Sequence, residues 1–105
     1  MPSPTLVQVR PSHRKGKKYA AVFSDGTTTH FGGAGCGDYI LYSKQNKALA
    51  DRKRAAYIAR HGATESWVDP TTPGSLSRFL LWEYRTLPQA IRRYPSHFRR
   101  RSSVS

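Results

Sequence analysis

Residues 17–31 decide the fold and read Lys17-Lys-Tyr-Ala-Ala-Val-Phe23, Ser24-Asp-Gly26 and Thr27-Thr-Thr-His-Phe31. In the first part, Tyr19, Ala21 and Phe23 alternate with other side chains, which is the period of a strand with one buried face. Gly26 accepts the positive φ that short hairpin turns need. The β-branched residues after the turn favour a second strand. The stretch therefore predicts an antiparallel hairpin.

A third strand is expected just before this hairpin. The stretch of residues 5–10 is short and rich in β-forming side chains. Pro11 is expected to end the strand because proline lacks a backbone donor. Strict alternation places two pairs on opposite faces, Leu6 with Gln8 and Val7 with Val9. Together with the hairpin, this strand predicts a three-stranded antiparallel meander.

The chain after the meander is expected to bend and then form a helix. Residues 32–37 contain four glycines and read as a bent connector, whereas residues 38–42 fit either a short strand or an irregular apolar segment. Ser43 is a plausible N-cap for a helix over about residues 44–61, with Gly62 as its C-terminal cap. Helical spacing gathers a stripe of mostly small residues that could lie close on the sheet: Ala48, Leu49, Ala55, Ala56 and Ala59.

Two further helices are predicted toward the C-terminus. Thr72 followed by Pro73 is a cap and first-turn pair, and it opens a helix that runs to about Arg85. Pro88 can open a last short helix, which Pro95 ends. Strands followed by helices indicate an α+β fold, with the small meander covered on one face by two to three helices.

Charge divides the chain into three parts: a basic N-terminal arm with a short strand (1–18), a small α+β domain (19–94) and a basic C-terminal tail (95–105). Residues 1–18 and 92–105 hold ten of the 18 basic residues and no acid. Such runs of like charge are typical of segments that bind polyanions. The candidate polyanion-binding or partner-binding residues are Arg10, Arg14, Lys15, Lys17, Lys18, Arg92, Arg93, Arg99, Arg100 and Arg101.

Several chemistries find no support in the sequence. The glycine run lacks the spacing of a dinucleotide fingerprint and the Gly-Lys-Ser/Thr of a P-loop. Cys36 is the only cysteine, the four histidines are scattered, and no His or Cys pair has metal-ligand spacing. The chain also lacks the apolar run of about 18 residues that a membrane-spanning helix needs. We therefore expect no enzymatic activity, no cofactor and no metal.

A secondary candidate face lies on the first predicted helix and consists of Arg54, Tyr57, Arg60 and His61. Arg54, Tyr57 and His61 share one side of the helix because they are three and seven residues apart. This side could bind nucleic acid, with aromatic rings for stacking and cations for phosphates. Alternatively, Tyr57 and its neighbour pack under the loop that carries Trp67.

Several stretches also resemble a known family. They are Lys18-Tyr-Ala-Ala-Val-Phe23, Phe31-Gly32, Gly37-Asp38-Tyr39, Arg54-Ala-Ala-Tyr57, Arg60-His61, Glu65-Ser-Trp67, Gly74-Ser-Leu-Ser-Arg78 and Leu81-Trp82. In this order they resemble small basic proteins of unassigned function from large nucleocytoplasmic DNA viruses of algae and protists. The resemblance implies a virus-particle component and supplies no active site.

Charge and resemblance together favour a non-enzymatic structural component of a large DNA virus particle, either a minor capsid protein or an internal virion protein. Its expected partners are larger capsid or virion proteins with acidic surfaces, to which the basic arms would tether it. An anionic inner membrane surface is another acidic partner that the arms fit. The alternative is a nonspecific DNA-binding protein that helps to condense the genome. The expected location is the virion and, before assembly, the host cytoplasm or nucleus.

Overall fold

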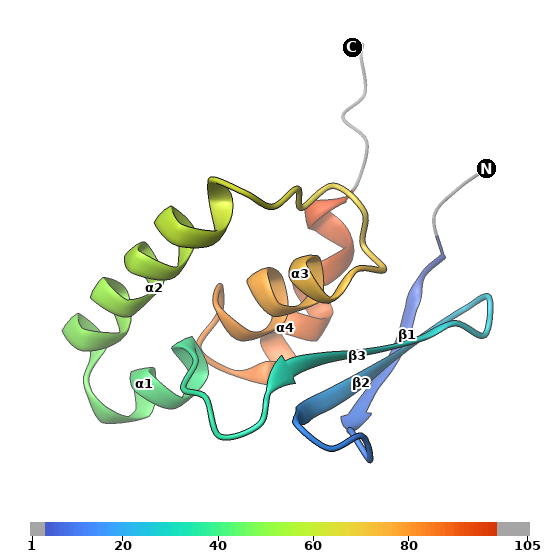
Figure 1. The fold of residues 1–105 in the computed structure, drawn as a ribbon, viewed down its shortest axis with the longest axis horizontal. Coiled ribbons are helices and arrows are strands. Elements are labelled where there is room, and N and C mark those ends of the chain that lie inside the picture. The colour runs from blue at the N-terminus through green and yellow to red at the C-terminus, as the bar shows by residue number, and fades with distance from the viewer. Residues whose placement is uncertain (1–3, 99–105) are drawn as a thin grey trace, which may run out of the picture.

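The computed structural model of the chain describes residues 4–98 (Figure 1). Three strands come first: β1 (Leu6–Pro11), β2 (Lys17–Phe23) and β3 (Thr28–Gly33). The helical elements follow in the order α1 (Tyr39–Gln45), α2 (Lys47–Gly62), α3 (Pro73–Leu76), the π-helical turn η1 (Ser77–Leu81), α4 (Leu87–Arg93) and the 3₁₀ turn η2 (Tyr94–His97). This arrangement confirms the predicted α+β fold.

The strands form an antiparallel sheet in the order β1-β2-β3, as the hairpin pattern predicts. Tyr19 pairs with Phe31 across β2 and β3, so two aromatic side chains meet on the same face. Gly26 in the connecting turn has a φ of +88°, the left-handed conformation that glycine adopts without strain.

The prediction for the faces of β1 is wrong at one point. The pairing register with β2 shifts between Leu6 and Gln8, which marks a β-bulge. The extra residue turns Leu6 and Val9 toward the core together, whereas Val7 is 64% exposed. Strict alternation cannot anticipate such a shift, because the bulge is a property of the pairing and not of the single strand.

The core lies between one face of the sheet and the C-terminal helices. The sheet supplies Ala21, Phe23 and Phe31, and all three are almost fully buried. The helices cover them with Leu76, Leu80, Leu81, Ala90 and Tyr94. In Figure 1, α3 and α4 accordingly lie over the sheet, whereas α1 and α2 extend to one side of it.

The chain forms two helices where one was predicted. Residues 39–45 are helical, which corrects the expectation of a strand or irregular segment, and Ser43 lies inside α1 instead of capping α2. The Asp38 carboxylate caps α1 by accepting from the Leu41 amide, and Asn46 caps α2 by accepting from the Leu49 amide. Asp and Asn at these positions are favourable N-caps, so the helix pair is encoded locally.

The orientation of α2 is the reverse of the predicted one. Ala48, Ala55, Ala56 and Ala59 are exposed, whereas Ala50 and Tyr57 are buried. Arg54 and His61, on the same side as Tyr57, are half-buried. The helix therefore contacts the rest of the chain through its polar and aromatic side, and its alanine-rich side faces outward.

The C-terminal helices begin where the sequence predicts but do not end where it predicts. The Thr72 hydroxyl accepts from the Ser75 amide, with Pro73 in the first turn of α3, so that start is confirmed. The helix ends at Leu81 and not near Arg85, and its last turn is π-helical. Pro95 does not end the chain's helical structure either, since it lies in the first turn of η2.

His97, at the end of η2, makes stability depend on pH. Its Nε2 lies 2.8 Å from the Tyr84 hydroxyl, and its ring stacks on Phe79 with centroids 4.1 Å apart. Burial lowers the pKa of His97 below its usual 6.5; Glu83 opposes this effect and Arg78 adds to it. The folded chain thus favours the neutral ring, and its stability should fall as the pH drops below about 6.5.

This prediction is checked by thermal melts at pH 7.5 and 5.5. The His97→Gln variant should lose part of the pH dependence of the melting temperature that the parent chain shows. Burial and the nearby Arg14 also lower the pKa of His30, so His30 accounts for a further part of the pH dependence. The His30→Gln variant is therefore the matched comparison. Identical pH dependence in the parent and the His97 variant would contradict the assignment.

Candidate functional site

A cleft of about 420 Å³ opens where the start of β2, the glycine loop after β3, the C-terminal end of α2 and the start of α3 converge. Its lining combines cations, acids, a thiol and aromatic rings. The charged and reactive members are Lys17, Lys18, Cys36, Asp38, Arg60, His61 and Glu65. A cleft of this size falls within the range of small-molecule sites in proteins.

An ion pair between Lys18 and Asp38 forms part of the cleft lining, and Asp38 directly follows the glycine loop in the sequence. The Lys18 Nζ lies 2.6 Å from Asp38 Oδ2, and the two side chains are only 15% and 5% exposed. The second Asp38 oxygen accepts from the Leu41 amide, 2.9 Å away. Both Asp38 oxygens are therefore used internally, and this carboxylate joins β2 to the start of α1.

A second part of the lining is His61, which a carboxylate holds in place. Its Nδ1 lies 2.5 Å from Glu65 Oε2, while Glu65 Oε1 accepts from the Trp67 indole nitrogen at 2.9 Å. Partial burial alone would raise the pKa of Glu65, but the hydrogen bonds from His61 and Trp67 lower it below its usual value. The carboxylate is therefore ionised at neutral pH and keeps a proton on His61 Nδ1, since a carboxylate anion only accepts hydrogen bonds.

Three stacked rings line the wall between α2 and η1. Tyr57 stacks on His61 with ring centroids 4.3 Å apart and on Trp82 with centroids 4.5 Å apart. Burial raises the pKa of Tyr57 to about 12, so its hydroxyl stays protonated. Tyr57 thus packs inside the molecule, with His61 and Trp82 on its two faces. The alternative interpretation of the secondary candidate face is right about the burial of Tyr57 but names the Trp67 loop as its cover and leaves the charges in solvent, whereas Arg54 and His61 are half-buried.

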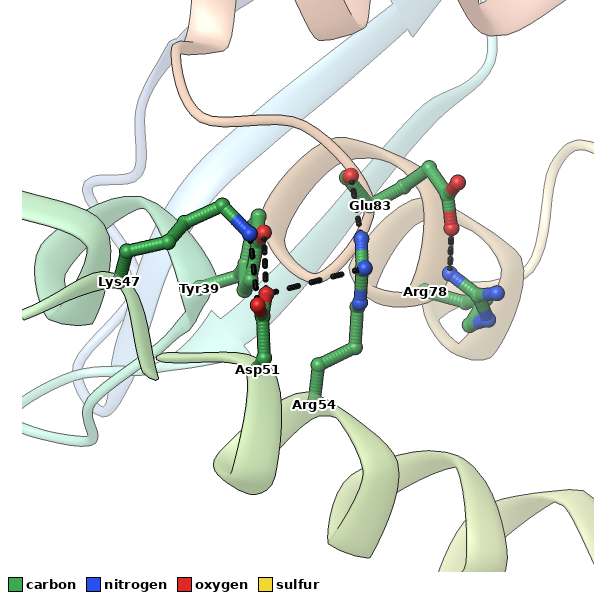
Figure 2. A network of polar contacts seen from close by, with 6 residues as sticks. All are labelled: Tyr39, Lys47, Asp51, Arg54, Arg78 and Glu83. Atoms are coloured by element: carbon green, nitrogen blue, oxygen red, sulfur yellow. Dashed lines mark hydrogen bonds and ion pairs between the residues drawn. The ribbon is translucent and has the colours of Figure 1, made fainter. Parts of the chain in front are cut away.

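A polar network fixes α2 against the body (Figure 2). Asp51 accepts from the Tyr39 hydroxyl at 2.8 Å and from Lys47 Nζ at 2.6 Å. Arg54 donates to the Glu83 carbonyl oxygen at 3.0 Å and lies over the Tyr39 ring. Arg54 therefore has a structural role between α2 and the segment after η1, and Arg60 is the one exposed residue of the secondary candidate face.

Every acidic side chain of the sequence makes an internal contact. Asp38, Asp51 and Glu83 form ion pairs at 2.6 Å with Lys18, Lys47 and Arg78, and Glu65 accepts a hydrogen bond from the His61 imidazole. Asp25 and Asp69 accept hydrogen bonds in turns from Thr27 and Thr71, which lower the pKa of both carboxyls. Asp25 and Asp69 remain exposed, ionised and outside any ion pair with a described residue, so these two carboxylates offset only a small part of the outer basic charge.

The basic surface comprises the exposed cations that form no ion pair with these acids. They are Arg10, Arg14, Lys15, Lys17, Lys44, Arg52, Lys53, Arg60, Arg85, Arg92 and Arg93. Four lie on β1, β2 and their connecting turn, which form a folded hairpin. Others follow the outer side of α2 and the end of α4.

The residues predicted to bind a polyanion or partner fall into three groups: exposed, paired inside the molecule, and outside the described part of the chain. Arg10, Arg14, Lys15 and Lys17 are exposed on the β1–β2 hairpin, and Arg92 and Arg93 are exposed at the end of α4. Lys18 is bound to Asp38, so its charge is already neutralised inside the molecule. The predicted residues 99–101 lie outside the described part of the chain.

Sequence reasoning did not anticipate the cleft. Cys36 and His61 appear unrelated along the chain, but the fold places both on its lining. The His61–Glu65 contact had a readable signal, since residues four apart are neighbours on a helix and the turn that follows it. Within residues 4–98, no group of three or more potential ligands could hold a metal ion, and no helix is long and apolar enough to cross a membrane.

The comparisons with known proteins add a family but no function. The model of a family of unknown function, DUF5754, matches residues 7–61. The chain belongs to the DUF5754 family. No curated protein and no solved structure matches it. The DUF5754 match covers the sheet, the glycine loop, α1 and most of α2, and hence much of the cleft lining.

Proposed function

We propose that this chain is a non-enzymatic structural protein that binds the phosphate backbone of nucleic acid through its basic surface. The observation that carries the proposal is the division of charge: four of the six acids are bound to histidine, lysine or arginine side chains, while eleven exposed cations form no ion pair with a described residue. Contacts between such cations and phosphates release counterions and bind DNA with little regard to sequence.

The distribution of apolar side chains favours nucleic acid over an acidic protein surface. The exposed large hydrophobic residues among those described are Val7, Leu41 and Val68, and they lie on β1, on α1 and in the loop before α3. Protein interfaces usually have an apolar centre from which charged residues are depleted. A surface with many exposed cations and only scattered apolar residues therefore fits a phosphate backbone better than it fits an acidic protein surface.

Helix α2 offers a suitable contact element. Its outward side carries Arg52, Lys53 and Arg60 with alanines between them, and its only acid, Asp51, is bound to Lys47 and Tyr39. Arg52 and Arg60 are about 12 Å apart along the helix axis, from the rise of 1.5 Å per residue. The major groove of B-DNA has about this width and admits a helix, and alanine side chains permit close approach.

A virus particle is the proposed setting, and the resemblance to proteins of large DNA viruses supports it. The second candidate, docking onto acidic grooves of larger shell proteins, is supported by the same cations and by the tail. Proteomics of purified, nuclease-treated particles tests the setting. Absence of the chain from both the shell fraction and the genome-associated fraction would contradict it.

The binding proposal predicts a steep dependence on salt. If about eight cations meet phosphates, the affinity for a duplex of random sequence should fall with a log–log salt slope near −7, at about 0.9 per phosphate. Fluorescence anisotropy with a labelled duplex between 50 and 300 mM salt measures this slope. A slope near −1 would exclude backbone binding, and preference for polyglutamate over DNA would favour the shell proteins.

A further inference from the structure

We propose that the cleft between the glycine loop and the end of α2 binds a nucleotide, with the phosphate held by Lys17 and Arg60 and the ring against the aromatic wall. The proposal goes beyond binding to a duplex backbone. It concerns one phosphorylated nucleoside, either free or at the end of a strand, in a cleft of about 420 Å³.

The charge of the cleft selects an anion. Of its two acids, Asp38 is neutralised by Lys18, and Glu65 is bound to His61 and Trp67. Lys17 and Arg60 line the same cleft, are exposed, and form no ion pair with a described acid. Two cations facing one hollow suit a phosphate group, for which arginine provides a planar fork of donors.

His61 adds a polar atom with a defined position. Because Nδ1 is hydrogen bonded to Glu65, Nε2 is the ring nitrogen left for a ligand. Glu65 cannot swing away freely, since its other oxygen accepts from Trp67 at 2.9 Å. With its proton on Nδ1, the neutral ring accepts a hydrogen bond through Nε2 from a ribose hydroxyl, whereas a bond to a phosphate oxygen requires a second proton, on Nε2.

The aromatic wall, formed by Tyr57, His61 and Trp82, suits a ligand that contains a planar ring. Trp82 and His61 both line the cleft and stack on opposite faces of Tyr57. Stacking of bases on aromatic side chains tolerates any base, because every base has a π face. On the other side, Gly33 and Gly37 let the loop backbone pack against Cys36 and Tyr42, because a Cβ at either glycine would collide with the Cys36 Sγ or the Tyr42 hydroxyl.

Tryptophan fluorescence measures binding, because Trp82 belongs to the cleft. We expect saturable quenching by adenosine monophosphate and at least about tenfold weaker binding of adenosine or of inorganic phosphate alone. Arg60→Ala should weaken binding of the monophosphate about tenfold or more, as expected for a lost charge-assisted hydrogen bond. Arg52→Ala removes an equal charge two turns away on α2, outside the cleft lining, and should change binding less than about twofold.

The result that overturns the proposal is absence of saturable quenching by the monophosphate at millimolar concentration, or equal losses in the Arg60 and Arg52 variants. Equal binding of adenosine and of its monophosphate would also overturn it. A 5′-phosphorylated oligonucleotide that binds more tightly than its 5′-hydroxyl counterpart and than the free monophosphate identifies a strand end as the ligand. Duplex binding at varied salt is measured on the same variants, so failure of the cleft leaves the backbone proposal separately testable.

Discussion

Replacement of Asp38 with alanine should destabilise the fold by about 3–5 kcal/mol, because it leaves the Lys18 ammonium without its partner in a nearly closed environment. The same change removes the N-cap of α1, which contributes about 1 kcal/mol in other proteins. A domain of this size has a total stability on the order of 5–15 kcal/mol. The variant should therefore unfold at a much lower urea concentration than the parent chain.

Two further variants separate the ion pair from the cap. Asp38→Ser keeps a capping oxygen for the Leu41 amide but removes the charge, so it should lose most of the stability that Asp38→Ala loses. Lys18→Met in the Asp38→Ser background removes the unpaired ammonium and should recover a large part of the loss. If the double variant is no more stable than Asp38→Ser in urea titrations, the ion pair is not the cause.

The sequence predicted the elements whose signals are local. The hairpin turn at Gly26 and the Thr72 cap each follow from a few neighbouring residues, and both are confirmed. The Asp38 cap was equally local, but the apolar residues 39–42 after it also fit a strand. Short apolar runs do not distinguish the two structures, which is why α1 was not predicted.

The side of α2 that faces the body depended on contacts that no helical pattern contains. Hydrophobic spacing favoured the alanines, but burying an alanine removes little apolar surface from water. Tyr57 removes much more apolar surface from water when it stacks on Trp82. Arg54 donates a hydrogen bond to the Glu83 carbonyl across the same interface. The larger gain orients the helix, and the alanines remain outside.

The candidate cleft was beyond sequence reasoning for a related reason. Its parts come from the start of β2, the loop after β3, the end of α2 and the start of α3, so it exists only once the sheet and helices have packed. The charge pattern pointed to Lys17 and the helical spacing pointed to His61. Neither pattern indicated that these two residues line one cleft together with Cys36 and Trp82.

Neutralising the outer side of α2 should have the largest effect on DNA binding. In the triple variant Arg52→Gln, Lys53→Gln and Arg60→Gln, we expect the log–log salt slope to become less negative by about 2.7, from 0.9 per lost phosphate contact, and duplex affinity near 100 mM salt to fall about a hundredfold. All three side chains are exposed, and none caps a helix or contacts the core cluster, so the fold should persist.

The matched control neutralises Arg85, Arg92 and Arg93, which are equally exposed near or on α4. Both triple variants lower the net charge by the same amount, so any long-range attraction of DNA falls equally in the two proteins. A smaller change of slope in the α4 variant is expected if α2 lies against the duplex, because only contacting cations release counterions. Equal changes would contradict a localised contact at α2, and an unchanged slope in both variants would exclude the described basic surface as the site of backbone binding.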